Sequence, residues 1–496
     1  MKQDSGELFE LITGLSLSER RYCSLYLQKH SAQDENRYLK LFGFLCKQER
    51  YDAGAAIKIS GYEKKPAHYA VLKKQLFEQL LDALHQFDLF TNPEQQLLRG
   101  IHQCYLLLQK GLFKTCEKRI KALVQQAVEM NHYEAQLQLQ QLKMMMKARN
   151  YYRHETEAAL NDWSSETEDI LKQLEITNRY RYLSSRVFKI QYDSGSRGKE
   201  QAELMKQVIK LPEFADERKA VTTRARLDFL QVWALYYFTN LETEKASAFN
   251  EKFLHMLDSN RLLLQLHADR YFSVLNNYLI DCLVLKRYET LEEGLQKLRA
   301  LPKIAAFKRL ANFDANVFRL GYLLEMNYML TIRNFIGAYK RIPAIKAGIE
   351  KFGGRIVKHN LITLQYLMGY VCFVLKKYDE ALDHLQFILQ QKETAVAENL
   401  QLAARMLQLL CHFEKGDALL LDSLIKSLRR YLKSDASADM QRLVISFVQG
   451  AARKGIVEQE QWNKLNEKLK KLAADKDSAA AMNLFNYLDW AQNHLP

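Results

Sequence analysis

Proline and glycine are scarce in this sequence, with 6 prolines and 19 glycines among 496 residues. Helix interiors disfavour both residues, so their scarcity favours a chain built mostly of helices. The alternation of apolar and polar residues that marks half-buried strands is nearly absent, which argues against a sheet. The composition therefore predicts an all-α fold.

Long apolar runs are also missing. No stretch of about 18 uninterrupted apolar residues occurs, and the amino terminus lacks a basic start followed by a long apolar core. We therefore expect no membrane insertion and a cytoplasmic location. The seven cysteines are an odd number and include no C-x-x-C motif, which argues against a disulfide framework.

Motifs that carry chemistry are incomplete. His154-Glu155 begins like the zinc motif H-E-x-x-H, but Ala158 stands where the second histidine is needed. The glycine-containing segment 195–199 is too short for a phosphate-binding loop, and Glu200 replaces the Ser or Thr that would hold magnesium. We therefore predict no catalytic residue, no cofactor and no metal site, and we expect a protein that is not an enzyme.

One feature that is present is a repeated helical pair. The segment 361–389 reads as two amphipathic helices joined by a tight polar turn. Gly369 is a small residue where the two helices would cross, and Tyr378 lies three residues before Ala381, near the start of the second helix. With Ala381 as an anchor, similar arrangements recur along the chain. The anchors are Cys116, Ala246, Leu291, Ala338, Ala381 and Leu421.

The spacing of the anchors predicts a stacked array. From Ala246 onward they recur at a nearly even interval, and the much longer gap after Cys116 predicts two further units near Ala159 and Ala202. A single helical pair cannot bury its apolar face alone, so stacked neighbours are expected. The units resemble tetratricopeptide repeats, although their pitch exceeds the family's usual pitch of about 34 residues. The resemblance implies a right-handed α-solenoid of antiparallel helix pairs. The intervals between anchors give this solenoid a pitch of about 40–47 residues, and an N-terminal helical head precedes it.

Three parts are predicted: a helical head over 1–95, repeats over 96–436 and capping helices over 437–496. In the head, Ser16 and Glu19 form a potential capping box at the start of a helix. The pattern of three helices is compatible with a DNA-binding helix-turn-helix. However, the head carries 13 basic and 13 acidic residues, whereas a DNA-binding head is normally basic. A packing or capping role for the head is therefore favoured.

The resemblance also implies a binding groove, lined by the first helix of each unit. The candidate groove residues are Tyr105, Phe238, Asn276, Asn327, Tyr366, Tyr370 and Phe373. The whole lining is mostly apolar, so something must cover it. Three alternatives stay open: a partner's helix or extended segment, the chain's own head or tail, or a superhelix too tight to leave a groove.

Positive charge is concentrated in one region. The chain carries a formal net charge of +14, and residues 297–358 hold 13 basic residues against three acidic ones. The candidate basic patch consists of Arg309, Arg333, Lys340, Arg341, Lys346, Lys351, Arg355 and Lys358. A second cluster, over 179–199, mixes basic residues with tyrosines, a pattern that can bind single-stranded nucleic acid.

Two functions fit these features. The favoured one is a protein-interaction scaffold that binds a partner helix or peptide through the solenoid surface. The alternative is a nucleic-acid-binding or regulatory repeat protein that uses the basic region 297–358.

Overall fold

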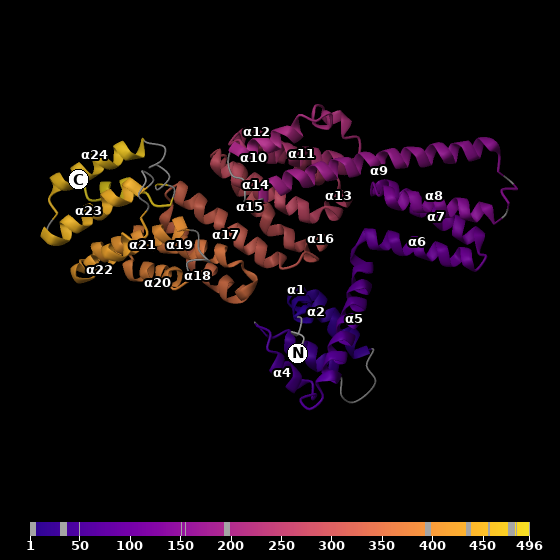
Figure 1. Ribbon diagram of the computed structural model, residues 1–496, viewed down its shortest axis with the longest axis horizontal. Helices are drawn as coiled ribbons and strands as arrows, with labels where there is room; N and C mark the ends of the chain where they lie inside the picture. The colour runs from indigo at the N-terminus through magenta and orange to yellow at the C-terminus, as the bar shows by residue number, and fades with distance from the viewer. Residues whose placement is uncertain are drawn as a thin grey trace. The chain divides into compact units, whose positions relative to one another are not determined.

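The chain is all-helical in the part that the structure describes. The computed structural model describes residues 6–29, 37–48, 50–149, 151–153, 155–192, 199–391, 398–432, 438–454, 457–474, 482 and 484–495. Every regular element in these residues is a helix, and none is a strand (Figure 1). The predicted all-α class is confirmed. Within the same residues, no helix has the length and apolar character needed to cross a membrane.

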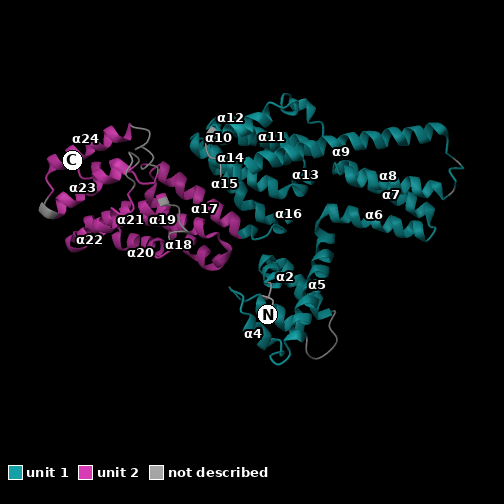
Figure 2. Ribbon diagram, viewed as in Figure 1, with its two compact units in different colours: residues 1–314 teal, residues 315–496 magenta. Residues whose placement is uncertain are grey.

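The chain divides into two compact units, residues 1–314 and 315–496 (Figure 2). The predicted three-part division at 95 and 436 stays a prediction.

Unit 1 begins with a helical head that has its own core. Its helices are α1 (Glu7–Gly14), α2 (Leu17–Lys29), α3 (Arg37–Leu45), α4 (Ala53–Ile59) and the start of α5 (Pro66–Thr91). Buried residues of all five helices form one apolar core, which includes Phe42 of α3 and Ala56 of α4. The predicted capping box is confirmed, because the Ser16 backbone N–H donates to Glu19 Oε2 at 2.7 Å and the Glu19 N–H donates to Ser16 Oγ at 3.3 Å.

The rest of unit 1 is a succession of helices in which each packs against its neighbours in the chain (Figure 1). They are α6 (Pro93–Gln109), α7 (Phe113–Glu129), α8 (Tyr133–Ala148), α9 (Glu157–Tyr192), α10 (Lys199–Ile209), α11 (Thr223–Thr239), α12 (Thr243–Asp258), α13 (Arg261–Leu266), α14 (Ala268–Val284), α15 (Tyr288–Ala300) and α16 (Ala305–Lys308). Short 3₁₀ turns cover Pro212–Phe214, Glu217–Lys219 and Leu301–Lys303.

Unit 2 has the same character. Its helices are α17 (Phe313–Thr331), α18 (Phe335–Phe352), α19 (Lys358–Val374), α20 (Tyr378–Leu389), α21 (Glu398–Lys415), α22 (Ala418–Leu428), α23 (Asp439–Lys454), α24 (Gln459–Ala473) and α26 (Tyr487–Gln492), with a 3₁₀ turn at Gly353–Arg355. One continuous apolar core joins residues of α17 through α26.

The same backbone turn precedes all six predicted anchors. At the end of α19, Lys376 is left-handed with φ 58°, its N–H donates to Phe373 O, and the Lys377 N–H donates to Cys372 O. This pair of hydrogen bonds satisfies carbonyl groups that the end of a helix leaves without partners. The left-handed residues of the six turns are Gly111, Leu241, Lys286, Arg333, Lys376 and Gly416.

Each anchor lies five residues after the left-handed residue, and each is buried. The repeat seen in the sequence is therefore a repeat of local structure. The two further units predicted near Ala159 and Ala202 are less clear. Both alanines lie in the first turn of a helix, α9 or α10, but neither is buried. The chain just before α10 lies outside the described residues.

Helices approach closely where glycine replaces a side chain. A Cβ added at Gly348 of α18 would overlap the Phe318 ring of α17. That ring is held in place by Tyr322 and Phe352, with ring centroids 5.1 Å away in both cases. At Gly369 of α19, by contrast, the nearest atom would be a Leu385 side-chain carbon at 3.4 Å, which is ordinary contact.

These two glycines make a matched test of packing. We expect Gly348→Ala to lower the free energy of unfolding by about 1–3 kcal/mol, because overpacking displaces an immobilised ring. Gly369→Ala should change it by less than about 1 kcal/mol, because the added methyl fits and alanine favours a helix. Thermal and urea unfolding followed by circular dichroism measure both. Equal losses in the two variants would contradict this account of the α17–α18 contact.

Candidate functional site

Four of the seven candidate groove residues lie on four different helices. In unit 1, Tyr105 lies on α6, Phe238 at the end of α11 and Asn276 on α14; Phe238 is 50% exposed and the other two are half-buried. In unit 2, Asn327 uses its amide nitrogen to donate to Leu323 O of its own helix at 2.7 Å. None of these four residues lines the hollow that the structure forms beside α19.

The other three share one face of α19, because they are spaced by four and three residues. Tyr366 and Phe373 are buried and Tyr370 is half-buried. The chain itself covers them with residues 484–495, which we call the cover segment. The Tyr366 hydroxyl donates to Leu484 O at 3.0 Å, and the Phe485 ring lies 5.3 Å from Tyr370 and 5.5 Å from Phe373. Of the alternatives for what covers the groove, the chain's own segment is the one observed on α19.

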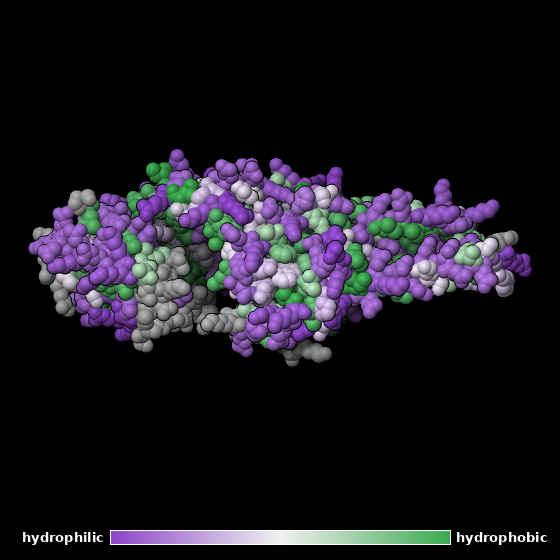
Figure 3. Space-filling model, turned by 90° about the horizontal axis from the view of Figure 1, so that it is seen from above, coloured by the Kyte–Doolittle hydropathy of each residue, from purple (hydrophilic) through white to green (hydrophobic). Residues whose placement is uncertain are grey.

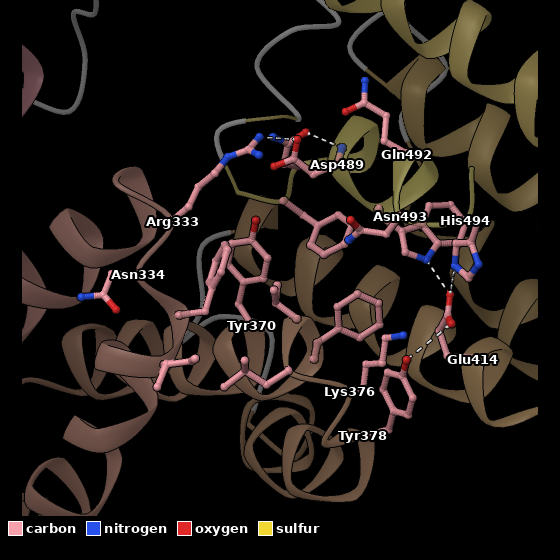
Figure 4. A pocket seen from close by; sticks show the side chains of 18 residues that line it. Arg333, Asn334, Tyr370, Lys376, Tyr378, Glu414, Asp489, Gln492, Asn493 and His494 are labelled. Atoms are coloured by element: carbon pink, nitrogen blue, oxygen red, sulfur yellow. Dashed lines mark hydrogen bonds and ion pairs between the residues drawn. The ribbon is translucent and has the colours of Figure 1, made fainter. Parts of the chain in front are cut away.

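An ion pair at one edge joins the cover segment to the turn between α17 and α18. Arg333, the left-handed residue of that turn, places Nη2 2.6 Å from Asp489 Oδ1 (Figure 4). The Arg333 side chain is 66% exposed. Water screens such a pair, so it stabilises by at most about 1 kcal/mol and serves mainly to set the position of the segment.

A half-buried carboxylate anchors the other edge. Glu414 of α21 accepts a hydrogen bond from Trp490 Nε1 at 2.7 Å, lies 2.8 Å from His494 Nε2, and accepts a longer bond from the Tyr378 hydroxyl at 3.4 Å (Figure 4). Burial by itself raises the pKa of Glu414, but the donors from His494 and Trp490 outweigh it, so the net pKa is lowered. The ionised carboxylate only accepts, and the facing nitrogens therefore donate.

Aromatic rings hold the same end of the cover segment. His494 stacks on Trp462 of α24, with ring centroids 4.0 Å apart and planes 9° apart. Trp490 meets Trp462 edge-on at 5.3 Å and Phe413 at 6.1 Å. A helix of six residues such as α26 is too short to be stable alone, so its conformation depends on these contacts.

A hollow of about 640 Å³ remains beside the cover segment. The aromatic residues Tyr370, Phe373 and Tyr378 line it, and so do Lys376 and Asn334, which belong to two different interhelical turns (Figure 4). The remaining lining residues are Arg333, Phe335, Ile336, Val374, Leu375, Glu414, Phe485, Asn486, Asp489, Trp490, Gln492, Asn493 and His494. Half of the lining residues have polar or charged side chains, so the hollow combines an aromatic surface with many hydrogen-bonding groups.

Among the described residues, no group of three or more His, Cys, Asp or Glu side chains could hold a metal ion. Burial raises the pKa of Cys372 to about 11 and of Cys411 to about 12, so neither thiol is reactive at neutral pH. His154 and residues 195–198, which belong to the two incomplete motifs, lie outside the described residues.

The candidate basic patch is divided between the two units. In unit 1, Arg309 lies 3.8 Å from Asp88 Oδ1 and donates to Gln265 O. In unit 2, Arg333 pairs with Asp489, and Arg341 lies 3.0 Å from Glu325. The other members are exposed. They are Lys340, Lys346, Lys351, Arg355 and Lys358, on α18, the following 3₁₀ turn and the start of α19.

The second basic cluster, on α9, is partly core. Tyr180 is buried and donates to Glu213 O at 2.6 Å, whereas Tyr182 and Tyr192 are exposed. The Arg186 guanidinium lies 6.0 Å from the Tyr182 ring centroid. Hydrophilic side chains cover most of the face of the molecule that Figure 3 shows, with apolar side chains in scattered patches.

Sequence reasoning missed the residues that complete the site. Phe485, Asp489, Trp490 and His494 fell within predicted capping helices, and Glu414 was one acidic residue among many. The only sequence signal is the density of aromatic residues in 485–490.

Comparison with known proteins adds no relative: no family model matches the chain, and no curated protein matches it.

The anchoring role of Glu414 can be tested directly. Replacing Glu414 with Ala removes the acceptor of Trp490 and His494, and we expect it to weaken attachment of the cover segment by about 1.5–3 kcal/mol. Glu414→Gln keeps one acceptor oxygen and should lose less. Hydrogen exchange of the 487–492 amides measures this, with the amides of α19 as reference. Unchanged protection in Glu414→Ala would show that the aromatic contacts alone hold the segment.

The same group predicts a pH dependence. Because the pKa of Glu414 is lower in the folded chain than its ordinary value of 4.5, the stabilisation is present above that pH and is lost as pH falls through the folded pKa. Protection of the 487–492 amides should therefore decrease on acidification, and it should decrease less in Glu414→Gln.

Proposed function

We propose that this chain is a non-enzymatic interaction scaffold that binds a partner helix or peptide at the hollow of unit 2. In this proposal the helices form a tetratricopeptide-like, right-handed α-solenoid of antiparallel pairs after a helical head. The recurrent interhelical turn and the buried anchor five residues after it support that architecture.

The observation that carries the proposal is the cover segment itself. It is a short segment that lies on the face of α19. The Phe485 ring contacts the rings of Tyr370 and Phe373, Asp489 forms an ion pair with Arg333, and Trp490 donates to the half-buried Glu414 carboxylate. These are the contacts by which folded domains hold short segments of other proteins: side chains in apolar pockets and polar groups that fix register.

The hollow beside the cover segment has room for side chains of a partner. Ile336 is 65% exposed at its edge, and Lys376 presents an exposed cation. A partner that lays apolar side chains on Tyr370 and Phe373 and a carboxylate near Lys376 would use both. Charge at the rim would chiefly speed encounter, and apolar burial would supply affinity.

Partner capture tests this function with a matched control. The tagged full-length chain is isolated from its native cells under mild conditions with nuclease present, and co-purifying proteins are quantified by mass spectrometry. We expect Lys376→Glu combined with Ile336→Glu to lower recovery of a reproducible partner about tenfold or more. Lys286→Glu makes the same lysine-to-glutamate change in the equivalent left-handed turn of unit 1, without a second substitution, and should leave recovery unchanged. Absence of any reproducible partner would sink the proposal.

A second candidate, nucleic-acid binding, is favoured by one specific observation. Lys346, Lys351, Arg355 and Lys358 are exposed within a short stretch of unit 2. Cations in such a cluster can follow a phosphate backbone.

Salt dependence tests this candidate. Affinity of the full-length chain for a labelled single-stranded oligonucleotide should fall steeply as salt rises. Reversing Lys351 and Arg355 should lower the slope of log K against log salt by about one for each phosphate that the chain no longer neutralises. Fluorescence anisotropy measures it. A weak affinity that neither salt nor the reversal alters would remove this candidate.

A further inference from the structure

The cover segment contacts the rest of unit 2 through three kinds of interaction, which follow one another in a fixed order along the segment. Phe485 places a ring between Tyr370 and Phe373. Four residues later Asp489 places a carboxylate at Arg333. Trp490 and then His494 bring nitrogens to Glu414. Together these contacts define what the site recognises: an aromatic ring, a carboxylate and an N–H donor along one short segment.

The Glu414 carboxylate influences which ligands best replace the cover segment. If the cover segment left, this carboxylate would lose its two short hydrogen bonds while remaining at the base of the hollow. Glu414 would then keep only the longer hydrogen bond from the Tyr378 hydroxyl, and a half-buried carboxylate that loses its short hydrogen bonds is destabilised. A ligand that brings a donor of its own to Glu414, from a tryptophan, histidine or cationic side chain, therefore replaces the segment better than one that brings none.

Like a bound peptide ligand, the cover segment depends on contacts with other helices for its conformation. The six residues of α26 depend on α21 and α24 for their shape, and the hollow stays about 640 Å³ in volume beside them. One side of that hollow is built from the cover segment itself, by Asp489, Gln492 and Asn493. Occupancy by residues 484–495 therefore leaves the site only partly filled.

We propose, resting on the proposed function, that the partner is a short segment carrying an aromatic residue, a carboxylate and an N–H donor in that order, and that residues 484–495 compete with it from within the chain. A tethered segment acts at an effective concentration in the millimolar range. A free segment of the same chemistry at micromolar concentration cannot displace it, so the wild-type chain binds such a segment weakly. Weakening the tethered copy raises the fraction of free sites and the apparent affinity with it.

The test uses the full-length chain and a fluorescent synthetic peptide with the sequence of residues 484–495. The full-length chain carries Phe485→Ala and Trp490→Ala. These two changes weaken the binding of its own cover segment and leave the face of α19 and Glu414 unchanged. We expect the peptide to bind this variant at least tenfold more tightly than it binds the wild type, by fluorescence anisotropy. A peptide carrying the change Asp489→Lys should bind at least fivefold more weakly than the parent peptide.

Site specificity has its own control. Adding Glu414→Ala to the weakened variant should abolish the gain, because the Trp490 and His494 of the peptide then lack their acceptor. A scrambled peptide that binds as tightly as the parent peptide overturns the proposal. So does a wild-type dimer that the parent peptide dissociates in light scattering, since that result places a second copy's segment in the site.

A measurement on the unmodified chain guards against a variant that fails to fold. In wild-type protein, the amides of 487–492 should exchange faster than those of 366–373 on α19, because the segment leaves while the helix stays folded. Equal protection in the two stretches overturns the proposal. None of these assays contains the native partner, so they succeed or fail independently of partner capture.

Discussion

The turn that ends one helix and opens the next is the constraint on which this molecule depends. Two hydrogen bonds to the last carbonyls fix the direction in which the chain leaves, and a left-handed residue makes that exit possible. The next helix then starts at a set place, and the position five residues beyond the left-handed one falls against the preceding helix. Ala381 is buried for this reason, and Cys116 and Leu421 are buried at the same offset.

The left-handed position is filled differently along the chain. Gly111 and Gly416 adopt the conformation without strain, whereas Arg333 and Lys376 adopt it at a cost of roughly 1–3 kcal/mol. Both of these cations line the hollow of unit 2. A glycine in either place would relax the backbone and remove a charge from the site. Strain alone is not a mark of function, since Leu241 holds the same conformation in unit 1.

Features that repeat within a single helical pair could be predicted from the sequence, whereas contacts between distant segments could not. The anchors were visible because burial at a fixed interval leaves a trace within a single helical pair. Asn131 occupies the same kind of turn between α7 and α8, yet no anchor could be recognised there because polar Gln136 stands five residues later. The contacts of the site could not be predicted from local pattern, because Tyr366 and Leu484 are 118 residues apart and Glu414 and His494 are 80 residues apart. No periodicity connects positions at that distance, so the segment that covers the α19 face could not be predicted.

The distance in sequence between the α19 face and its cover also sets an order of events during synthesis. A ribosome makes residues 366–373 well before residues 484–495. For that interval the Tyr370 and Phe373 rings and the Glu414 carboxylate have no intramolecular occupant. A partner segment that is present while the chain is still being translated meets an empty site, whereas one that arrives later must compete with the chain itself. Timing of encounter would then control occupancy of this surface as strongly as affinity does.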